Sequence, residues 1–350
     1  MADNEKAILK VGYNCNNNCL ICHASGNRFH KSLNTEEIID KISLCRKRGI
    51  NFVLLSGGEP TIRKDLPVIA EFIKKKGMFW GLITNARMLS YEDYVKKLIG
   101  LNLRYVYASF YSYDKNIHNT MTGANSFEQS LKGIKNAASD KNIELIVNIP
   151  LTGININNLK EMLDMLRKIG VTKIKFSFIE LKGNALKNID RLILPLSKAS
   201  EDVRDAMLYA EKKGFNVLCS GFPPCLMQGF ESNIDDFEKQ GITCMSEAFE
   251  NGIFPVDRND KAKTSRCPGC EKNELCSGID KNYINLYGDS EIKPISKISN
   301  SAFFVLAREI SQKELRKTEI KENEILLENK KKLYLFSYKS NDFSKKELEK

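Results

Sequence analysis

The sequence predicts an α/β fold built on a parallel sheet. Two observations support this prediction. Apolar runs such as residues 51–56 are continuous rather than alternating, which is typical of strands buried on both faces. Each run is followed by a stretch with helical periodicity, and alternating strands and helices build parallel sheets with covered faces. The 350 residues, of which 42% are hydrophobic, suffice for two domains or for one large α/β unit with additions.

Six strands and five intervening helices can be placed along the first 180 residues. The first helix begins at Asn34, a capping residue followed by Glu36 and Glu37, and ends at Gly49. The strands are expected at residues 7–13, 51–56, 79–84, 105–110, 143–149 and 173–179, and the helices at 34–49, 65–76, 91–99, 126–138 and 159–169.

The rest of the chain is less regular. A linker is expected at 181–195, followed by a helix at 200–213 and a strand at 215–219. The stretch from 221 to 265 shows no periodicity, and a loop of that length in a globular protein needs something to hold it. Residues 291–350 form a basic appendage with 14 Lys and Arg against 10 Asp and Glu. A helix at 302–317 and a hairpin of 323–328 with 333–338 are expected there, as a solvated tail or a substrate-docking element.

Composition limits the kind of protein. The net charge of +10 suggests an anionic partner, but the charges are spread along the chain and there is a single Trp, which argues against a nucleic-acid module. The sequence contains no run of about 18 apolar residues, which is the length that a membrane span requires. The first ten residues lack an apolar signal region, so a cytoplasmic location is expected. Thiols remain reduced there, so we interpret the ten cysteines as metal ligands in preference to disulfides.

Three cysteines, Cys15, Cys19 and Cys22, lie within eight residues of each other in an Asn-rich turn. Three thiolates on one loop make a soft site that selects iron–sulfur or zinc over hard cations. A cubane iron–sulfur cluster normally takes four cysteines, so three leave one position open for a substrate or cofactor. We therefore interpret this loop as catalytic. A zinc knuckle or chance clustering is the alternative.

A second motif, Gly57-Gly58-Glu59-Pro60, directly follows the predicted strand at 51–56. The two glycines let the backbone approach a ligand closely. Glu59 supplies a negative acceptor, and Pro60 stiffens the exit from the turn.

Together, the C-x3-C-x2-C loop and the Gly-Gly-Glu-Pro turn resemble those of radical S-adenosylmethionine (SAM) enzymes. The resemblance implies that Cys15, Cys19 and Cys22 bind a [4Fe-4S] cluster whose unique iron takes the amino and carboxylate groups of SAM. It implies that the Gly-Gly-Glu-Pro turn holds the methionine ammonium group. It also implies a partial (β/α)6 barrel of the TIM type, over residues 1–195. The family usually has an aromatic residue before the third cysteine, and here that residue is Ile21.

Four polar residues lie at or just beyond predicted strand ends, where ligands bind in such barrels: Asn85, Ser109, Tyr111 and Asn148. We expect Asn85, Ser109 and Asn148 to contact SAM. Related enzymes often carry Ser-x-Asp at the fourth strand, and here Tyr111 replaces the acid. The alternative for each is a loop polar group without a ligand. His118 is assigned a structural role.

A second group of cysteines lies in the irregular region. The spacing C-x2-C-x5-C of Cys267, Cys270 and Cys276 resembles the auxiliary-cluster region of SPASM and twitch domains, which implies a small iron–sulfur domain over residues 196–290. A full SPASM domain with two extra clusters needs seven or more cysteines, and this region has six, so one auxiliary [4Fe-4S] cluster is expected. The Pro-rich turn before Cys225 presents its side chain rigidly, which makes Cys225 the expected fourth ligand. Cys219 and Cys244 are the alternatives, and zinc is the alternative metal.

The resemblance implies a mechanism. The cluster passes one electron, delivered by a donor such as flavodoxin or ferredoxin, to SAM, and the resulting 5′-deoxyadenosyl radical abstracts hydrogen from the substrate. The auxiliary cluster would bind substrate or carry away an electron. Barrels of this kind with one or two extra clusters often modify ribosomally made peptides, so the resemblance implies such a peptide as the first substrate class. A nucleotide or sugar small molecule in cofactor or antibiotic biosynthesis is the second class, and it ranks lower because a nucleotide would require clustered Arg, whereas Arg is scattered along the chain. A non-catalytic electron-transfer or regulatory protein is a third hypothesis, against which the Gly-Gly-Glu-Pro motif argues.

Overall fold

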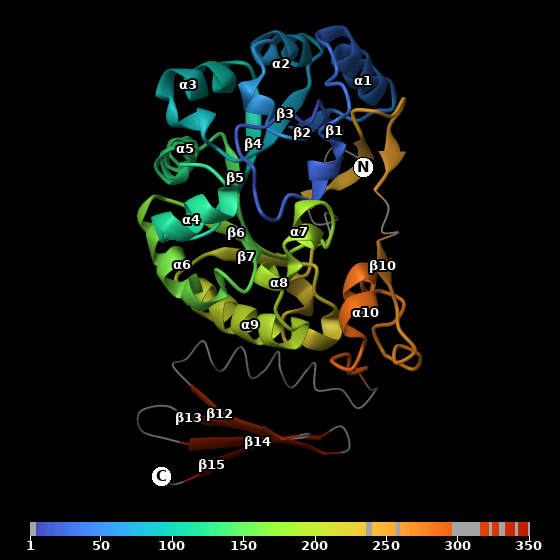
Figure 1. Cartoon of the computed structure of the whole chain (residues 1–350). Helices are drawn as coiled ribbons and strands as arrows, with labels where there is room; N and C mark the ends of the chain where they lie inside the picture. The colour runs from blue at the N-terminus through green and yellow to red at the C-terminus, as the bar shows by residue number, and fades with distance from the viewer. Residues whose placement is uncertain are drawn as a thin grey trace. The chain divides into compact units, whose positions relative to one another are not determined.

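The structure is a computed structural model of the chain (Figure 1). It describes residues 5–235, 240–256 and 260–295, and the backbone of four strands between residues 316 and 348. These residues group into two compact units. The first consists of Met1–Pro195, Lys213–Gly221 and Asp235–Asn259, and the second of Leu196–Lys212, Phe222–Ile234 and Asp260–Lys350.

A nine-stranded sheet forms the frame of the first unit, in the order β7-β6-β5-β4-β3-β2-β1-β8-β9 (Figure 1). The strands are β1 Lys6–Lys10, β2 Phe52–Ser56, β3 Phe79–Thr84, β4 Leu103–Ser109, β5 Glu144–Leu151, β6 Lys173–Phe178, β7 Asn216–Ser220, β8 Ile242–Ser246 and β9 Phe254–Pro255. All pairs from β7 to β8 are parallel, and β9 is antiparallel to β8. The predicted α/β fold and its six strands are confirmed.

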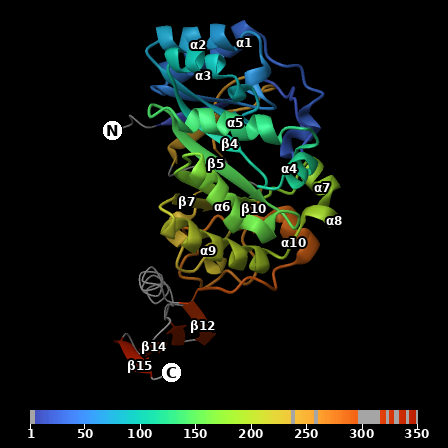
Figure 2. The same ribbon diagram turned by 90° about the vertical axis from the view of Figure 1, so that its left-hand side faces the viewer.

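Helices follow the strands and lie outside the sheet, as α5 does along β5 (Figures 1 and 2). They are α1 Thr35–Lys47, α2 Leu66–Lys75, α3 Glu92–Gly100, α4 Lys115–Thr122, α5 Phe127–Ala138 and α6 Leu159–Lys168. The predicted cap of α1 is confirmed, because Asn34 Oδ1 accepts a hydrogen bond from Glu37 N at 2.9 Å and Glu37 Oε2 accepts one from Asn34 N at 2.6 Å.

The interior of the barrel is filled by side chains from several strands, among them Ile8, Leu54, Tyr105, Ile146 and Ile242. Ile242 belongs to β8, so the last parallel strand helps to close this core. A buried ion pair lies in the same unit. Lys175 Nζ on β6 is 3.5 Å from Asp235 Oδ2, and both side chains are at most 2% exposed.

Two expectations for this unit were wrong. The stretch 221–265 was expected to be irregular, yet it supplies β8 and β9, because β8 finds a backbone partner in β1. Residues 181–195 were expected to be a linker, yet they contain the short helices α7 (Asn184–Lys187) and α8 (Ile189–Leu192). The chain passes from the first unit to the second after Pro195, and residues 213–221 and 235–259 belong to the first unit again.

The second unit contains α9 (Leu196–Lys212), α10 (Lys281–Tyr287) and the antiparallel pair β10 (Lys261–Ala262) and β11 (Ile279–Asp280). Its last described part is a four-stranded antiparallel sheet of β12 Arg316–Lys321, β13 Glu324–Glu328, β14 Leu333–Lys339 and β15 Asp342–Leu348. Pairing of β13 with β14 confirms the predicted hairpin. Most of the predicted helix at 302–317 lies outside the described residues, and its last two residues belong to β12.

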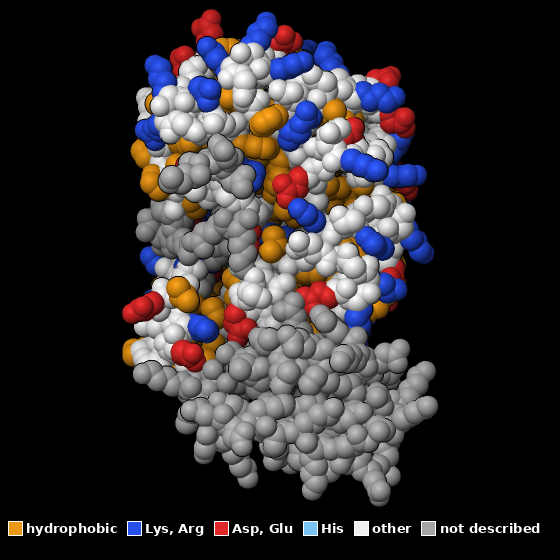
Figure 3. All heavy atoms as spheres, turned by 180° about the vertical axis from the view of Figure 1, so that it is seen from behind, with side chains coloured by type: hydrophobic (Ala, Val, Ile, Leu, Met, Phe, Trp, Pro, Cys, Tyr) orange, Lys and Arg blue, Asp and Glu red, His pale blue; other side chains and the backbone are white. Residues whose placement is uncertain are grey.

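On the described part of the face in Figure 3, Lys and Arg side chains are scattered, with Asp and Glu among them. None of the helices in the described ranges has the length and apolar character needed to cross a membrane.

Candidate active site and metal centre

The first three candidate ligands lie on the loop that leaves the carboxyl end of β1: Cys15, Cys19 and Cys22. The end of α4 holds this loop on either side of the central cysteine. Asn18 N donates to Thr122 O at 2.9 Å, and Leu20 N donates to Met121 O at 2.9 Å. A turn without regular structure is thereby fixed by its backbone.

Two arginines hold the Asn-rich part of the loop. Arg87 donates to Asn17 Oδ1 at 2.9 Å and to Asn16 O, while Arg28 donates to Asn18 Oδ1 at 3.0 Å and to Asn17 O at 3.2 Å. The asparagines thus serve as acceptors as well as turn formers. The same guanidinium groups place positive charge beside a site that would hold an anionic cluster.

Helix α7 covers the other side of the loop. Asn184 donates from its amide N to Cys22 O at 2.9 Å and from Nδ2 to Cys19 O at 3.1 Å, and Asn188 Nδ2 donates to Leu20 O at 3.3 Å. These contacts explain why the expected linker is helical, because it satisfies carbonyl groups of the cysteine loop.

The Gly-Gly-Glu-Pro turn is joined to the cysteine loop by backbone hydrogen bonds. Gly58 N donates to Gly12 O at 2.8 Å, and Glu59 N donates to Asn14 O at 2.8 Å. A side chain at Gly58 would place its Cβ 2.2 Å from Asn14 O, and Gly57 has a φ of +125°. Both glycines are therefore needed for two motifs 35 residues apart to touch.

Glu59 is 2% exposed, and its carboxylate accepts four hydrogen bonds from the protein. Oε1 accepts from Thr61 N at 3.0 Å, Thr61 Oγ1 at 2.6 Å and Thr84 Oγ1 at 2.7 Å, and Oε2 accepts from Asn85 N at 2.7 Å. Burial raises the pKa of Glu59, and these donors oppose that shift. The carboxylate thus ties the end of β2 to the end of β3. Pro60, also buried, starts a short 3-10 turn.

The thiol sulfurs themselves accept hydrogen bonds. Cys15 Sγ is 3.4 Å from Asn17 N and 3.9 Å from Asn85 Nδ2, and Cys19 Sγ accepts from Tyr111 Oη at 3.5 Å. Burial raises the pKa of Cys19 to about 12 and holds the pKa of Tyr111 well above its ordinary value. Thiols that are protonated at neutral pH must release protons to bind metal, as cluster ligands do.

The other predicted contacts lie on neighbouring strands. Ser109 on β4 is in register with Asn148 on β5. Ser177 on β6 donates to Asn148 Oδ1 at 2.6 Å, and Ser220 on β7 donates to Ser177 Oγ at 3.1 Å. A row of polar groups therefore crosses these strands. Ser109 and Ser220 are the last residues of β4 and β7, whereas Asn148 lies inside β5, which continues to Leu151 and not to residue 149 as predicted. Ser177 and Ser220 were not predicted as site residues, although both lie near the end of a predicted strand.

A further polar group at the ends of β1 and β8 was also missed. Glu247, the residue after β8, accepts hydrogen bonds from Lys10 Nζ and Tyr13 Oη. Ala248 packs in one apolar cluster with Tyr13, and the partly buried Cys22 lies against that cluster. Nothing in the sequence indicated this arrangement, because β8 was not predicted.

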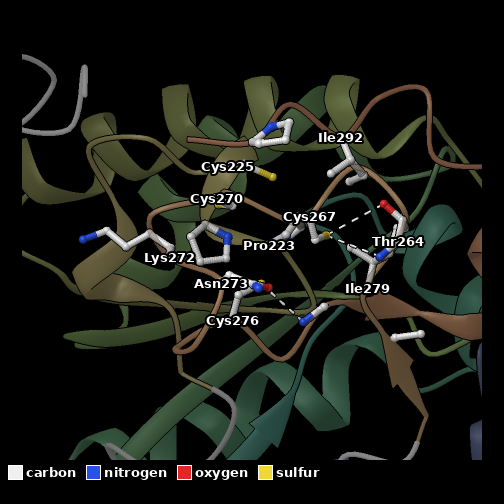
Figure 4. Close-up of a pocket in the computed structure, with 14 residues that line it drawn as sticks. Pro223, Cys225, Thr264, Cys267, Cys270, Lys272, Asn273, Cys276, Ile279 and Ile292 are labelled. Atoms are coloured by element: carbon white, nitrogen blue, oxygen red, sulfur yellow. Dashed lines mark hydrogen bonds between the residues drawn. The ribbon is translucent and has the colours of Figure 1, made fainter. Parts of the chain in front are cut away.

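In the second unit, four cysteines line one pocket (Figure 4): Cys225, Cys267, Cys270 and Cys276. Its other walls are largely apolar: Pro223, Pro224, Ile279, Ile292 and Pro294. The alternatives Cys219 and Cys244 lie on β7 and β8 of the first unit. In the described part of the chain, no three Cys, His, Asp or Glu side chains converge tightly enough to hold a single metal ion.

Three of these four sulfurs accept a hydrogen bond from a backbone N–H. The pairs are Thr264 N to Cys267 at 3.3 Å, Ile295 N to Cys270 at 3.4 Å, and Gly278 N to Cys276 at 3.3 Å. Burial raises the pKa of Cys225 to about 11. Backbone donors aimed at sulfur stabilise thiolates, so the donor set fits an iron–sulfur cluster.

Comparison with known proteins identifies the class. Residues 9–169 match the model of the Radical SAM superfamily. These residues therefore form a radical SAM domain, which confirms the part of the resemblance that rests on the two N-terminal motifs. The cofactors of this superfamily are a [4Fe-4S] cluster and SAM. The three partly buried thiols of the cysteine loop and the glycine turn described above fit both groups.

Among curated proteins, the chain is 28% identical over 210 residues to a probable GTP 3′,8-cyclase of Thermoplasma volcanium, covering 58% of this chain and 63% of that protein. It is 33% identical over 165 residues to a probable GTP 3′,8-cyclase of Sulfurisphaera tokodaii, covering 46% and 51%. It is 28% identical over 205 residues to the Fe-coproporphyrin III synthase of Methanosarcina barkeri, covering 57% and 51%. The chain thus spans less than two thirds of the length of each of these relatives.

Two solved structures share the fold. One is SuiB of Streptococcus suis bound to S-adenosylmethionine, with a TM-score of 0.59 and 13% identity over 81% of this chain and 74% of that one. The other is anSMEcpe with bound AdoMet and Cp18Cys peptide, with a TM-score of 0.60 and 14% identity over 87% and 95%. Both support the partial-barrel architecture.

Proposed function

We propose that this chain reductively cleaves SAM and uses the 5′-deoxyadenosyl radical to abstract hydrogen from its substrate. The observation that carries the proposal is the backbone contact between the cysteine loop and the Gly-Gly-Glu-Pro turn, two hydrogen bonds of 2.8 Å each. One small molecule can therefore touch both. When bound, the cluster supplies the electron for the cleavage of SAM.

The chain's own residues bind and orient the two groups. Cys15, Cys19 and Cys22 hold the cluster and leave one iron open. Residues 57–60 shape the place for the methionine end of SAM, with Glu59 bracing the turn from within. The remaining predicted contacts are proposed to bind the rest of SAM. Asn85 follows β3, Ser109 is the last residue of β4, and Asn148 lies inside β5.

We propose that Cys225, Cys267, Cys270 and Cys276 hold one auxiliary [4Fe-4S] cluster. Four cysteines satisfy a cubane, so no iron is left for direct substrate binding. The proposed role of this cluster is therefore to carry away the electron that remains after product formation.

The proposed substrate is a ribosomally made peptide. The basis is likeness in fold over most of the chain to proteins described with peptides, namely anSMEcpe and SuiB bound to its precursor peptide SuiA, the latter with a TM-score of 0.55 and 12% identity over 72% of this chain and 59% of that one. A net charge of +10 is compatible with an acidic peptide.

A nucleotide is the second candidate, because curated relatives are named probable GTP 3′,8-cyclase. That likeness covers 58% and 46% of the chain, whereas the likeness to anSMEcpe covers 87%. We also propose a flavodoxin or ferredoxin as electron donor and the cytoplasm as location, where thiols remain reduced.

Anaerobic incubation of the reduced, cluster-loaded protein with SAM tests the reaction. The expected product is 5′-deoxyadenosine, absent from a variant with Cys15, Cys19 and Cys22 replaced by Ala. No product above that background would refute the proposal. Adding either GTP or a synthetic peptide encoded by a neighbouring gene then distinguishes between the two candidate substrate classes. Deuterium transfer from the labelled substrate to 5′-deoxyadenosine identifies the right one.

A further inference from the structure

The phenol of Tyr111 reaches the central cysteine of the catalytic loop. Tyr111 Oη donates to Cys19 Sγ at 3.5 Å, and the tyrosine is 6% exposed. Tyr111 comes two residues after the end of β4, so the rigid sheet positions the phenol hydroxyl that donates this hydrogen bond.

Hydrogen bonding to its backbone and packing around its ring fix the position of Tyr111. Asn155 Nδ2 donates to Tyr111 O at 2.7 Å and to Pro150 O at 2.8 Å, which ties the backbone of Tyr111 to the end of β5. The ring of His118 meets the ring of Tyr111 edge-on, with centroids 5.6 Å apart, and packs against Phe110 at 4.5 Å. The phenol is therefore held by packing as well as by its hydrogen bond.

Backbone hydrogen bonds of its two neighbours fix the position of Cys19. The residues before and after it, Asn18 and Leu20, both donate backbone hydrogen bonds of 2.9 Å to the last carbonyls of α4. His118, which packs on Tyr111, belongs to the same helix. Helix α4 thus holds both partners, and the contact between sulfur and phenol is built into the fold.

We propose that Tyr111 raises the reduction potential of the N-terminal cluster by donating its hydroxyl hydrogen to the Cys19 thiolate. The proposal rests on the cluster proposed for this loop. Reduction adds negative charge to the ligand sulfurs, so a donor on one of them stabilises the reduced state more than the oxidised state. Because the pair is partly buried, the lower local dielectric strengthens the effect. Tyr111 acts through Cys19 and is a positioning residue.

The test is the midpoint potential of the cluster that responds to SAM, followed by EPR during an anaerobic redox titration. Tyr111→Phe removes one hydroxyl and keeps the ring. The expected result is a lower potential, with the ratio of reduced to oxidised cluster at fixed solution potential falling by about tenfold, which is about 59 mV for one electron. Tyr107→Phe, on β4, is the matched control, because it also removes one phenol hydroxyl, four residues earlier in the chain. Its potential should equal that of the wild type.

A second readout identifies the proton itself. An exchangeable proton coupled to the reduced cluster should appear in ENDOR spectra of the wild type in H2O, disappear in D2O, and be absent from Tyr111→Phe. A Tyr111→Phe potential equal to that of the control, or loss of the N-terminal iron on removal of one hydroxyl, would overturn the inference. A wild-type protein without a SAM-responsive cluster would instead refute the proposed function, so the two failures are distinguishable.

Discussion

Replacing Gly58 by Ala tests whether the two catalytic motifs must touch. The new Cβ would lie 2.2 Å from Asn14 O and 2.5 Å from Tyr13 O, both backbone atoms that cannot rotate away. Carbon and oxygen atoms in contact normally lie about 3.5 Å apart, so the turn and the cysteine loop must separate by more than about 1 Å.

That separation breaks the hydrogen bonds from Gly58 N to Gly12 O and from Glu59 N to Asn14 O. At about 1 kcal/mol for each bond, the folded state loses roughly 2 kcal/mol. A displacement of 1 Å in a reacting geometry costs about 100-fold in rate. The cysteines are untouched, so the N-terminal cluster should still assemble.

The assay compares the rate of 5′-deoxyadenosine formation, the iron content and the affinity for SAM of Gly58→Ala and Gly26→Ala. Gly26 lies in the same region, just after the third cysteine, and a Cβ there meets nothing within 4 Å. We expect full iron in both variants, with slow cleavage and weak SAM binding in Gly58→Ala alone. Equal rates for the two variants would refute the idea that SAM needs the turn and the loop in contact.

Three further predictions follow from buried groups. Burial lowers the pKa of His118 to about 4, so between pH 7 and pH 5 the unfolded chain binds the extra proton and the folded protein loses about 2 kcal/mol of stability. His118→Phe should remove this loss in anaerobic chemical unfolding at the two pH values, and an unchanged loss would contradict the assignment. Cys225→Ala should lose about half of the iron, as one of two four-iron clusters fails to form, whereas Cys244→Ala should keep it; equal iron in both would exclude Cys225 as a ligand. Lys175→Met leaves the carboxylate of Asp235 buried without its cationic partner, while the hydrogen bond from Gln240 Nε2 remains, and should cost about 3–5 kcal/mol in unfolding free energy, part of which a second change, Asp235→Asn, should restore.

Local sequence patterns predicted much of the fold. The strand at residues 79–84 agrees with β3, and the capped helix beginning after Asn34 agrees with α1. These elements are encoded by neighbouring residues, through apolar periodicity and capping groups that act within a few positions. The same holds for the two motifs that define the class, because a three-cysteine loop and a Gly-Gly-Glu-Pro turn are each contiguous.

Tertiary structure decided what depends on distant segments. Strand β8 exists because Ile242 is in register with Lys6, and the sequence has no local sign of that pairing. The contact between Tyr111 and Cys19 joins residues 92 positions apart. The amino-acid sequence by itself thus determined which chemistry is possible, because it sets the types of ligand residue and their spacing. Only the fold decided which side chains support those ligands, because packing and backbone pairing bring them together across the chain.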